Sequence, residues 1–398
     1  MKIIYHHRTR GRGAEGVHIT GVCDALTTLG HDVSLLSFPG SEPDITKSDS
    51  PSLNKRVKKK SFFAKVAEMT KIMPQFVFEI LELGYNGLAY KRLCDKNKEV
   101  GAEFVYERYS LFTFAGLLFA KSKKLPFIIE VNDSALVERV RPLKLSWLAK
   151  KIEKYVFQRA DGIVFISTEF QKIATNSYGK IAPSIISPNA ANIAHFKHDA
   201  MSNEDAKAKL GIDKNKIVAG YTGAFVHWHG IDWFIEEIIS ELKSHPDLTL
   251  LLIGDGVAFE PISELVKAHN LSEQVILTGR IAHTELSTYM SAMDFGILPD
   301  SNIYGSPMKL FEFMAMGKAM VLPSFTPITD VVENNKTGWI FEAKDRKACV
   351  KKVLEIYQNK EEIKQVGENA RNYIVNERQW THNAKDLLAL AFDNKEVS

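Results

Sequence analysis

The chain has few cysteines and no long hydrophobic run. Its 398 residues include only three cysteines, Cys23, Cys94 and Cys349, which are scattered and odd in number. We therefore expect neither a disulfide framework nor a zinc site. No stretch of the sequence approaches the roughly 18 apolar residues that a transmembrane helix needs. The first residues, Met1–Tyr5, are already typical of a strand, so no signal peptide is expected and a cytoplasmic location is predicted.

The charges are unevenly distributed along the chain. Residues 1–200 carry 30 Lys and Arg against 20 Asp and Glu, whereas the remainder carries 21 against 28. A basic half joined to an acidic half suggests that the first half meets an anionic partner. Part of the excess lies in the basic segment 55–60, which the apolar stretch 62–83 follows. This combination is typical of an interfacial helix on an anionic membrane, and equally of a solvated loop beside a core helix. No nucleic-acid recognition motif accompanies it.

Short apolar runs alternate with helical patterns throughout, which is typical of parallel α/β units. The length favours two domains, and we place their boundary in the mixed segment 188–202. The expected strands of the first half are 2–6, 32–37, 103–106, 126–131 and 162–166, with 184–187 as a sixth candidate. Those of the second half are 217–222, 248–253, 275–278, 295–298, 319–322 and 339–341, and a last helix is expected over 381–392. The sequence therefore predicts two doubly wound sheets, which bind ligands at the carboxyl ends of their strands.

The helix between the first two strands carries small residues. Val17, Gly21, Ala25 and Leu29 recur every four residues and fall on one face. We expect this face to approach the sheet closely.

A short helix near residue 308 carries the most informative chemistry. Ser306 is a suitable N-cap, Pro307 a suitable first helical residue and Gly317 a suitable stop. The amides at about Met308 and Lys309 would then form an anion site, helped by the helix dipole.

Two side chains of the same helix point to a nucleotide. Lys309 adds a positive charge to the first turn, and Glu312 could accept hydrogen bonds from two ribose hydroxyls. Together these features indicate a site for a nucleotide diphosphate. A capped helix with an incidental Lys and Glu is the alternative.

The N-terminal glycine loop, Gly11-Arg12-Gly13-Ala14-Glu15-Gly16, matches the dinucleotide fingerprint. Two details argue against a nicotinamide cofactor. Three polar residues precede the first glycine, and the next strand ends 36–38 without the acidic residue expected for a ribose. This loop would be strongly basic, since it would also carry His6, His7, Arg8, Arg10 and Arg12. An anionic acceptor would explain these charges, and a solvated loop without a ligand would explain them equally well.

The segment 304–317 resembles the signature of the retaining GT-B glycosyltransferases of family four (glycosyl transferases group 1), with Glu312 in the place of the second signature glutamate. Further segments resemble the same family in the same order: 187–190, 221–225, 229–232, 250–256 and 277–281. The resemblance implies a GT-B fold, in which two Rossmann-like domains of parallel sheets face each other across a cleft. It implies an acceptor-side domain over 1–190, completed by about 380–398, and a nucleotide-sugar domain over 196–377.

The sequence also departs from the family pattern. Tyr304 stands in place of the first signature glutamate. Ala224 and His229 stand where the family usually has the Arg and Lys that contact the diphosphate, and Asn132 stands where many members carry a His. We expect Lys309, Arg280, the helix amides and the backbone at Gly305 and Ser306 to hold the diphosphate instead, since the leaving group must be stabilised electrostatically. His229 could contribute only when protonated.

The resulting prediction is a metal-independent, retaining hexosyltransferase without a cofactor, which moves a sugar from a nucleotide diphosphate, in our expectation UDP, to a glycan or lipid-linked acceptor. Family habit and the basic first half suggest bacterial polysaccharide or lipopolysaccharide synthesis, and the basic half suggests association with the inner face of the plasma membrane. A nucleotide-sugar epimerase of the same architecture and a non-catalytic nucleotide-sugar-binding protein are the alternatives. The expected catalytic residues are Lys309 and Asn132, and the expected donor-binding residues are Gly13, Gly223, His229, Arg280, Tyr304, Gly305, Ser306 and Glu312.

Overall fold

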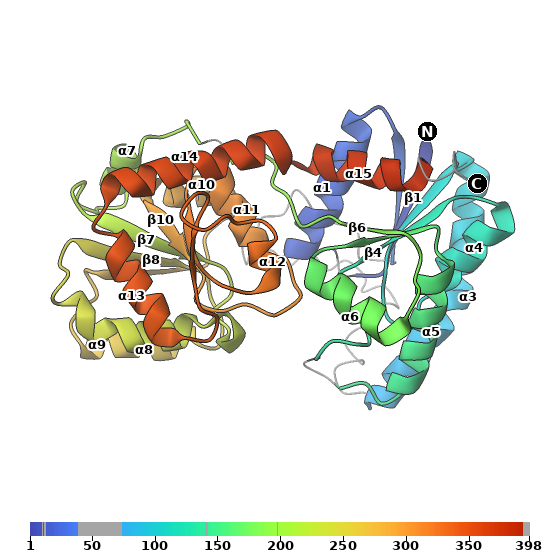
Figure 1. Ribbon diagram of the computed structural model, residues 1–398, viewed down its shortest axis with the longest axis horizontal. Coiled ribbons are helices and arrows are strands. Elements are labelled where there is room, and N and C mark those ends of the chain that lie inside the picture. The colour runs from blue at the N-terminus through green and yellow to red at the C-terminus, as the bar shows by residue number, and fades with distance from the viewer. Residues whose placement is uncertain (10, 12, 39–73, 140–141, 197, 393–398) are drawn as a thin grey trace, which may run out of the picture. The chain divides into compact units, whose positions relative to one another are not determined.

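The computed structural model describes residues 1–9, 11, 13–38, 74–139, 142–196 and 198–392. The basic segment 55–60, the start of the apolar stretch that follows it, and Arg10 and Arg12 lie outside the described residues. The chain divides into two compact units (Figure 1). Unit 1 holds the described residues up to Pro188 together with those from Trp380 onwards, and unit 2 holds Asn189–Gln379. Among the described residues, no helix is both long and apolar enough to cross a bilayer.

Unit 1 is built on a six-stranded parallel sheet in the order β2-β1-β3-β4-β5-β6. The central strands β3, β4 and β5 are buried over their whole length, which explains their mainly apolar sequences; the charged residues among them, Glu107, Arg108 and Glu130, are buried as well. The strands are β1 (Lys2–His7), β2 (Asp32–Ser37), β3 (Phe104–Arg108), β4 (Phe127–Val131), β5 (Gly162–Phe165) and β6 (Ser184–Ile186). The helices are α1 (Ala14–Thr28), α3 (Gln75–Val100), α4 (Ala115–Lys123), α5 (Ser146–Arg159), α6 (Thr168–Tyr178) and α15 (Trp380–Phe392).

Unit 2 contains a second six-stranded parallel sheet, in the order β12-β11-β10-β7-β8-β9. Its strands are β7 (Ile217–Thr222), β8 (Leu248–Ile253), β9 (Val275–Gly279), β10 (Phe295–Ile297), β11 (Met320–Pro323) and β12 (Trp339–Phe341). Its helices are α7 (Asn203–Lys209), α8 (Ile231–Leu242), α9 (Phe259–Ala268), α10 (His283–Ala292), α11 (Met308–Ala315), α12 (Thr326–Thr329), α13 (Arg346–Ile356) and α14 (Lys360–Glu377), with a 3₁₀ turn, η1, at His227–His229. All twelve strands lie where the sequence predicts them, with ends that differ by at most two residues.

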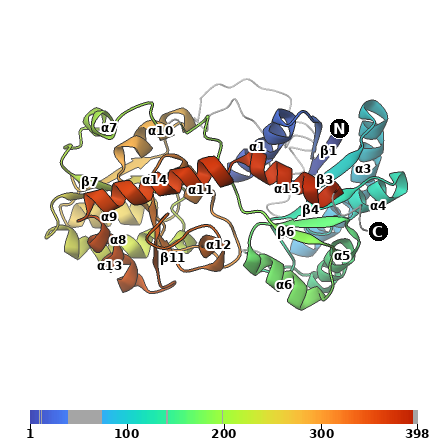
Figure 2. The same ribbon diagram turned by 45° about the horizontal axis from the view of Figure 1, so that its top comes forward.

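The last helix, α15, belongs to unit 1 and packs on α1 (Figure 2). Gly21 makes this contact close, because a β-carbon there would lie 2.5 Å from Nε1 of Trp380. The prediction that the small-residue face of α1 meets the sheet is therefore wrong at this position. Gly21 faces a helix that lies some 360 residues further along the chain, a contact that periodicity alone cannot reveal.

Candidate functional site

The candidate site of unit 2 lies where the strand order reverses. The chain runs β7, β8, β9 outward on one side of the sheet and then returns to place β10 beside β7 on the other. Ligands of doubly wound sheets bind at such a switch point, at the carboxyl ends of the strands. β7 ends at Thr222 and leads directly into Gly223, whereas α11 follows the loop after β10. This topology brings Gly223 and Lys309 together.

Lys309 extends over the loop that follows β7. A β-carbon built on Gly223 would lie 2.7 Å from Nζ of Lys309, so only glycine leaves room for the ammonium group. Nζ donates a hydrogen bond to Oη of Tyr221 at 3.2 Å and lies 4.3 Å from the centre of its ring. Burial lowers the pKa of Lys309 to about 7, although Glu312 acts to raise it. An anionic ligand at this position would restore the charged form of the amine.

The hydrogen bonds of Lys309 continue to His229. Oη of Tyr221 donates to the carbonyl oxygen of Ala224 at 2.7 Å, and Nδ1 of His229 lies 3.0 Å from the same oxygen. Nδ1 therefore carries the proton, and Nε2 of His229 is left as an acceptor. Burial, together with the charge of Lys309, lowers the pKa of His229 to about 4. His229 is thus neutral near pH 7 and does not contribute positive charge there.

Glu312 lies one turn after Lys309 on α11. Both residues are largely shielded from solvent, with intermediate exposure. Burial raises the pKa of Glu312 to about 7, while the nearby Lys309 opposes the shift. The first turn of α11 thus combines an amine and a carboxyl group that both titrate near neutrality, beside helix amides for which the helix itself supplies no acceptor.

The helix start differs from the prediction. α11 begins at Met308 with Pro307 as its N-cap, so Ser306 is not the cap and Pro307 is not the first helical residue. Ser306 is instead held by Asn189, whose backbone amide donates to Oγ at 3.0 Å and whose Nδ2 donates to the carbonyl oxygen at 2.6 Å. Gly317, with φ of 67°, follows the end of the helix as the sequence indicates.

The loop before α11 is held by hydrogen bonds between its own residues. Oδ1 of Asn302 accepts hydrogen bonds from the backbone amides of Tyr304 and Gly305. A β-carbon on Gly305 would meet Asn302 at 2.6 Å. The Gly305 amide therefore has an internal acceptor, which makes it a weaker candidate for the diphosphate than the amides inside α11.

Arg280 and Gly13 belong to other loops of the chain. Arg280 follows β9, and its Nε is 3.8 Å from a carboxylate oxygen of Asp255, with both side chains largely exposed. Gly13 is the N-cap of α1 in unit 1, where its φ of 58° suits glycine. The structure places neither residue among the contacts of Lys309.

In unit 1, Asn132 follows β4 and is held by a buried carboxylate. Nδ2 of Asn132 donates to Oε1 of Glu130 at 2.5 Å, and Arg108 donates to the same oxygen at 2.5 Å. The other oxygen of Glu130 lies 2.6 Å from Oη of Tyr106 and 2.8 Å from Nε2 of His18. Although burial acts to raise the pKa of Glu130, His18 and Arg108 outweigh it and lower the pKa to about 2. We call these residues the Glu130 network.

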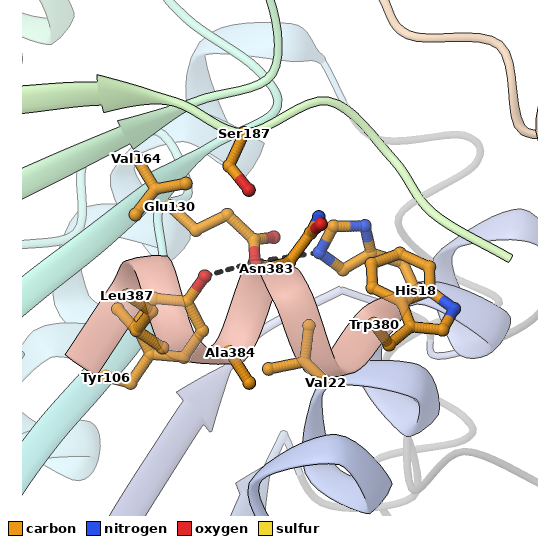
Figure 3. A pocket seen from close by; sticks show the side chains of 10 residues that line it. All are labelled: His18, Val22, Tyr106, Glu130, Val164, Ser187, Trp380, Asn383, Ala384 and Leu387. Atoms are coloured by element: carbon orange, nitrogen blue, oxygen red, sulfur yellow. Dashed lines mark hydrogen bonds and ion pairs between the residues drawn. The ribbon is translucent and has the colours of Figure 1, made fainter. Parts of the chain in front are cut away.

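A small cavity adjoins the Glu130 network (Figure 3). Its volume is about 10 Å³, the space of one water molecule. Trp380 of α15 closes one side and stands edge-on to His18, with ring centres 4.8 Å apart. The last helix thus takes part in positioning the polar side chains behind Asn132.

The expectation of a strongly basic N-terminal loop is wrong for three of its five residues. His6 is buried in β1 and lies 2.5 Å from Glu107, while His7 is buried against Oγ of Ser37. Burial, aided by His6, lowers the pKa of His7 to about 4. Arg8 forms an ion pair with Glu82 at 2.5 Å. Strand β1 runs one residue further than predicted, which takes His7 into the sheet.

The residues that support the site were not assigned a role from the sequence. Tyr221 is the penultimate residue of β7, beside the switch point, so its place near a strand end was an available signal. Asn302 binds amides two and three residues further along, a turn pattern typical of asparagine that the sequence could have shown. Glu130 is bound by Arg108 and His18, which only the folded chain brings to it. Within the described residues, no cluster of three or more His, Cys, Asp or Glu side chains is placed to hold a metal ion.

Comparisons with known proteins agree with this arrangement. Residues 202–373 match the family described as glycosyl transferases group 1. An uncharacterized glycosyltransferase of Methanocaldococcus jannaschii is 24% identical over 277 residues, which cover 69% of each chain. The sucrose-phosphate synthase structure from Thermosynechococcus elongatus has a TM-score of 0.73 at 16% identity and covers 100% of both chains. Anabaena HepE in complex with UDP has a TM-score of 0.68 at 13% identity and covers 99% of this chain and 100% of its own. Residues 202–373, most of unit 2, therefore belong to the group 1 glycosyltransferase family, and the whole chain shares the GT-B fold of these structures.

Proposed function

We propose that the protein transfers a sugar from a UDP-sugar to a glycan or lipid-linked acceptor with retention of anomeric configuration. The observation that carries the proposal is the position of Lys309 over Gly223 at the switch point of unit 2, with Glu312 one turn further along α11. The amine and the helix amides would hold the diphosphate, and Glu312 the ribose hydroxyls. The choice of UDP is supported by the shared fold with HepE, whose structure contains UDP.

The chemical role of Lys309 follows from the charge that develops on the leaving group. As the bond between the anomeric carbon and the diphosphate breaks, negative charge accumulates on the diphosphate oxygens. An ammonium group and oriented amides at that point stabilise the transition state more than the ground state. We propose that this stabilisation operates without a metal ion. Neutral His229 would accept, at Nε2, a hydrogen bond from a hydroxyl group of the sugar donor.

The acceptor is assigned to unit 1. Asn132 stands at the carboxyl end of β4, and the Glu130 network fixes its amide. We propose that Asn132 hydrogen-bonds a hydroxyl group of the transferred sugar or acceptor. The excess of positive charge in residues 1–200 supports an anionic acceptor and a cytoplasmic protein that works at the membrane surface.

The ribose contact can be tested directly. Glu312→Ala is expected to weaken UDP binding more than about tenfold, because charge-assisted hydrogen bonds are lost. Isothermal titration calorimetry with UDP measures the effect. Glu333→Ala is the matched control, since Glu333 is an exposed carboxylate of the same unit that pairs with Lys336. Equal affinities of Glu312→Ala and the wild type would refute the role of Glu312.

UDP affinity is expected to be highest near pH 7. Below that pH Glu312, whose pKa burial raises to about 7, takes up a proton and loses its acceptor charge. Above it Lys309, whose pKa burial lowers to about 7, loses its proton and its attraction for the diphosphate. Calorimetry at several pH values should show proton release on binding in acid and proton uptake in base. The interval from pH 6 to pH 8 extends about one unit on either side of the two pKa values. A UDP affinity that stays constant over this interval would contradict the coupling.

Gly223→Ala is expected to reduce UDP affinity by about tenfold or more, since the new methyl group would displace the ammonium of Lys309 and remove its charge-assisted contact. The variant also places alanine at a φ of 133°, a region that favours glycine. Gly211→Ala controls for that strain, because Gly211 has a φ of 70° and no atom within 4 Å of a built β-carbon. Titration of both variants with UDP should show a loss for Gly223→Ala alone.

A further inference from the structure

The N-terminal half of α3 exposes an apolar face. Between residues 76 and 88, the solvent-exposed positions hold only apolar residues and glycine: Phe76, Ile80, Leu81, Gly84, Gly87 and Leu88. Phe76 is 50% exposed, Ile80 53% and Leu81 48%. The outer face of a surface helix normally carries charged and polar residues. This face therefore lacks the solvation that an ordinary surface helix has, and a face of this kind marks an interaction site.

Helix α5 adds a tryptophan and positive charge. Trp147, in its first turn, is 64% exposed. The other exposed positions of α5 carry no carboxylate; they are Ser146, Lys150, Lys151, Lys154, Tyr155, Gln158 and Arg159. The one acidic residue of this helix, Glu153, is buried. α5 thus presents a cationic surface with an exposed aromatic ring at its N-terminal end.

The N-terminal ends of α3 and α5 are joined. Glu79 is buried and accepts hydrogen bonds from the backbone amides of Lys144 at 2.9 Å and Leu145 at 2.6 Å. Ile80 therefore follows Glu79, the residue that holds the start of α5. Trp147 lies two residues after Leu145, whose amide Glu79 binds. We define the α3–α5 surface as Phe76, Ile80, Leu81, Trp147 and the three exposed lysines of α5 (both helices are labelled in Figure 1).

We propose that the α3–α5 surface binds an anionic lipid bilayer. Exposed Phe, Ile and Leu side chains would enter the boundary between headgroups and acyl chains, and Trp147 would lie at the headgroup level, where tryptophan is enriched. The lysines would contact lipid phosphates, since cationic side chains gain energy near an anionic leaflet. A second copy of the chain fits less well, because a symmetric pair would bring the cationic faces of two α5 helices together. The proposal rests on the membrane association in the proposed function and assigns it to a surface of unit 1; it does not depend on the nucleotide site.

Co-sedimentation of the full chain with vesicles tests this surface. The wild type is expected to bind vesicles of equal parts phosphatidylcholine and phosphatidylglycerol and to leave phosphatidylcholine vesicles largely unbound. Lys150→Glu combined with Lys151→Glu should weaken binding at least about tenfold, and Phe76→Ser combined with Ile80→Ser by a similar factor. The charge control is Lys347→Glu with Lys351→Glu on α13, and the apolar control is Val257→Ser, where valine is 69% exposed. Both controls should bind as the wild type does.

A second measurement reports the depth of Trp147. Brominated lipids should quench part of the tryptophan fluorescence of the wild type, and Trp147→Phe should remove most of that quenching. UDP affinity in the absence of lipid should be unchanged in every variant, which shows that each is folded and separates this proposal from the nucleotide site. The proposal is overturned if the wild type ignores anionic vesicles, if the controls lose binding equally, or if Phe76→Ser with Ile80→Ser abolishes self-association instead of lipid binding.

Discussion

Lys309→Met is expected to lower kcat/KM for sugar transfer by at least about hundredfold, the range seen when one preorganised donor to a developing negative charge is removed. Methionine can fill the space of the lysine stem beside Gly223 but provides no hydrogen bond and no charge. The fold should be retained, because within the described part of the chain Nζ of Lys309 bonds to one side chain, that of Tyr221. A coupled assay that follows UDP release, with the donor varied, measures kcat and KM separately.

Lys318→Met is the matched control for this loss. Lys318 lies in the same unit, burial lowers its pKa to about 8, and Nζ is 3.5 Å from the carbonyl oxygen of Ser291. Lys318 lies beyond the C-terminal end of α11, whereas Lys309 lies in the first turn of that helix. If both lysine variants lost activity equally, the loss would reflect the fold of unit 2 and the role of Lys309 would be refuted.

Glu130→Gln is expected to destabilise unit 1 by about 3–5 kcal/mol, because it leaves the buried guanidinium of Arg108 without a carboxylate. The glutamine amide also cannot accept on both sides from His18, Tyr106 and Arg108. In a unit of this size the melting temperature should fall by on the order of 10 °C. Differential scanning calorimetry of the variant and the wild type at pH 7 measures the change. Glu103→Gln, at an exposed carboxylate that accepts from the Lys2 amide, should have little effect.

The same variant predicts a pH dependence of stability. The pKa of Glu130 is about 2 in the folded chain, below the ordinary value of 4.5. Its contribution is therefore present above pH 4.5 and is lost as the pH falls from there towards 2. The difference in melting temperature between wild type and Glu130→Gln should shrink over this interval. A difference that stays constant would show that the charge of Glu130 is not what stabilises the network.

The sheets could be predicted from the sequence because each buried strand carries its own apolar run. Strand β8, for example, is buried at all six positions and consists of Leu248–Ile253. Helix α15 was also expected over 381–392, and α11 was expected from its proline at the start and Gly317 at its end. These are local signals, which a stretch of sequence carries by itself.

The errors came from contacts between distant residues. Ser306 has the side chain of an N-cap, but Asn189, 117 positions away, takes its hydroxyl group. Gly21 has the periodicity of a sheet-facing residue and meets Trp380 instead. In each case a tertiary partner outweighed a correct local preference.

The unit 2 site thus depends on one piece of geometry, the amine of Lys309 held above a glycine at the switch point of the sheet. A crystal structure of the protein with UDP tests that claim most directly. The account predicts the pyrophosphate within hydrogen-bonding distance of Nζ of Lys309 and of the first amides of α11, with the ribose hydroxyls on the carboxylate of Glu312. Pyrophosphate bound away from α11, or a site that stays empty at saturating UDP, would contradict it.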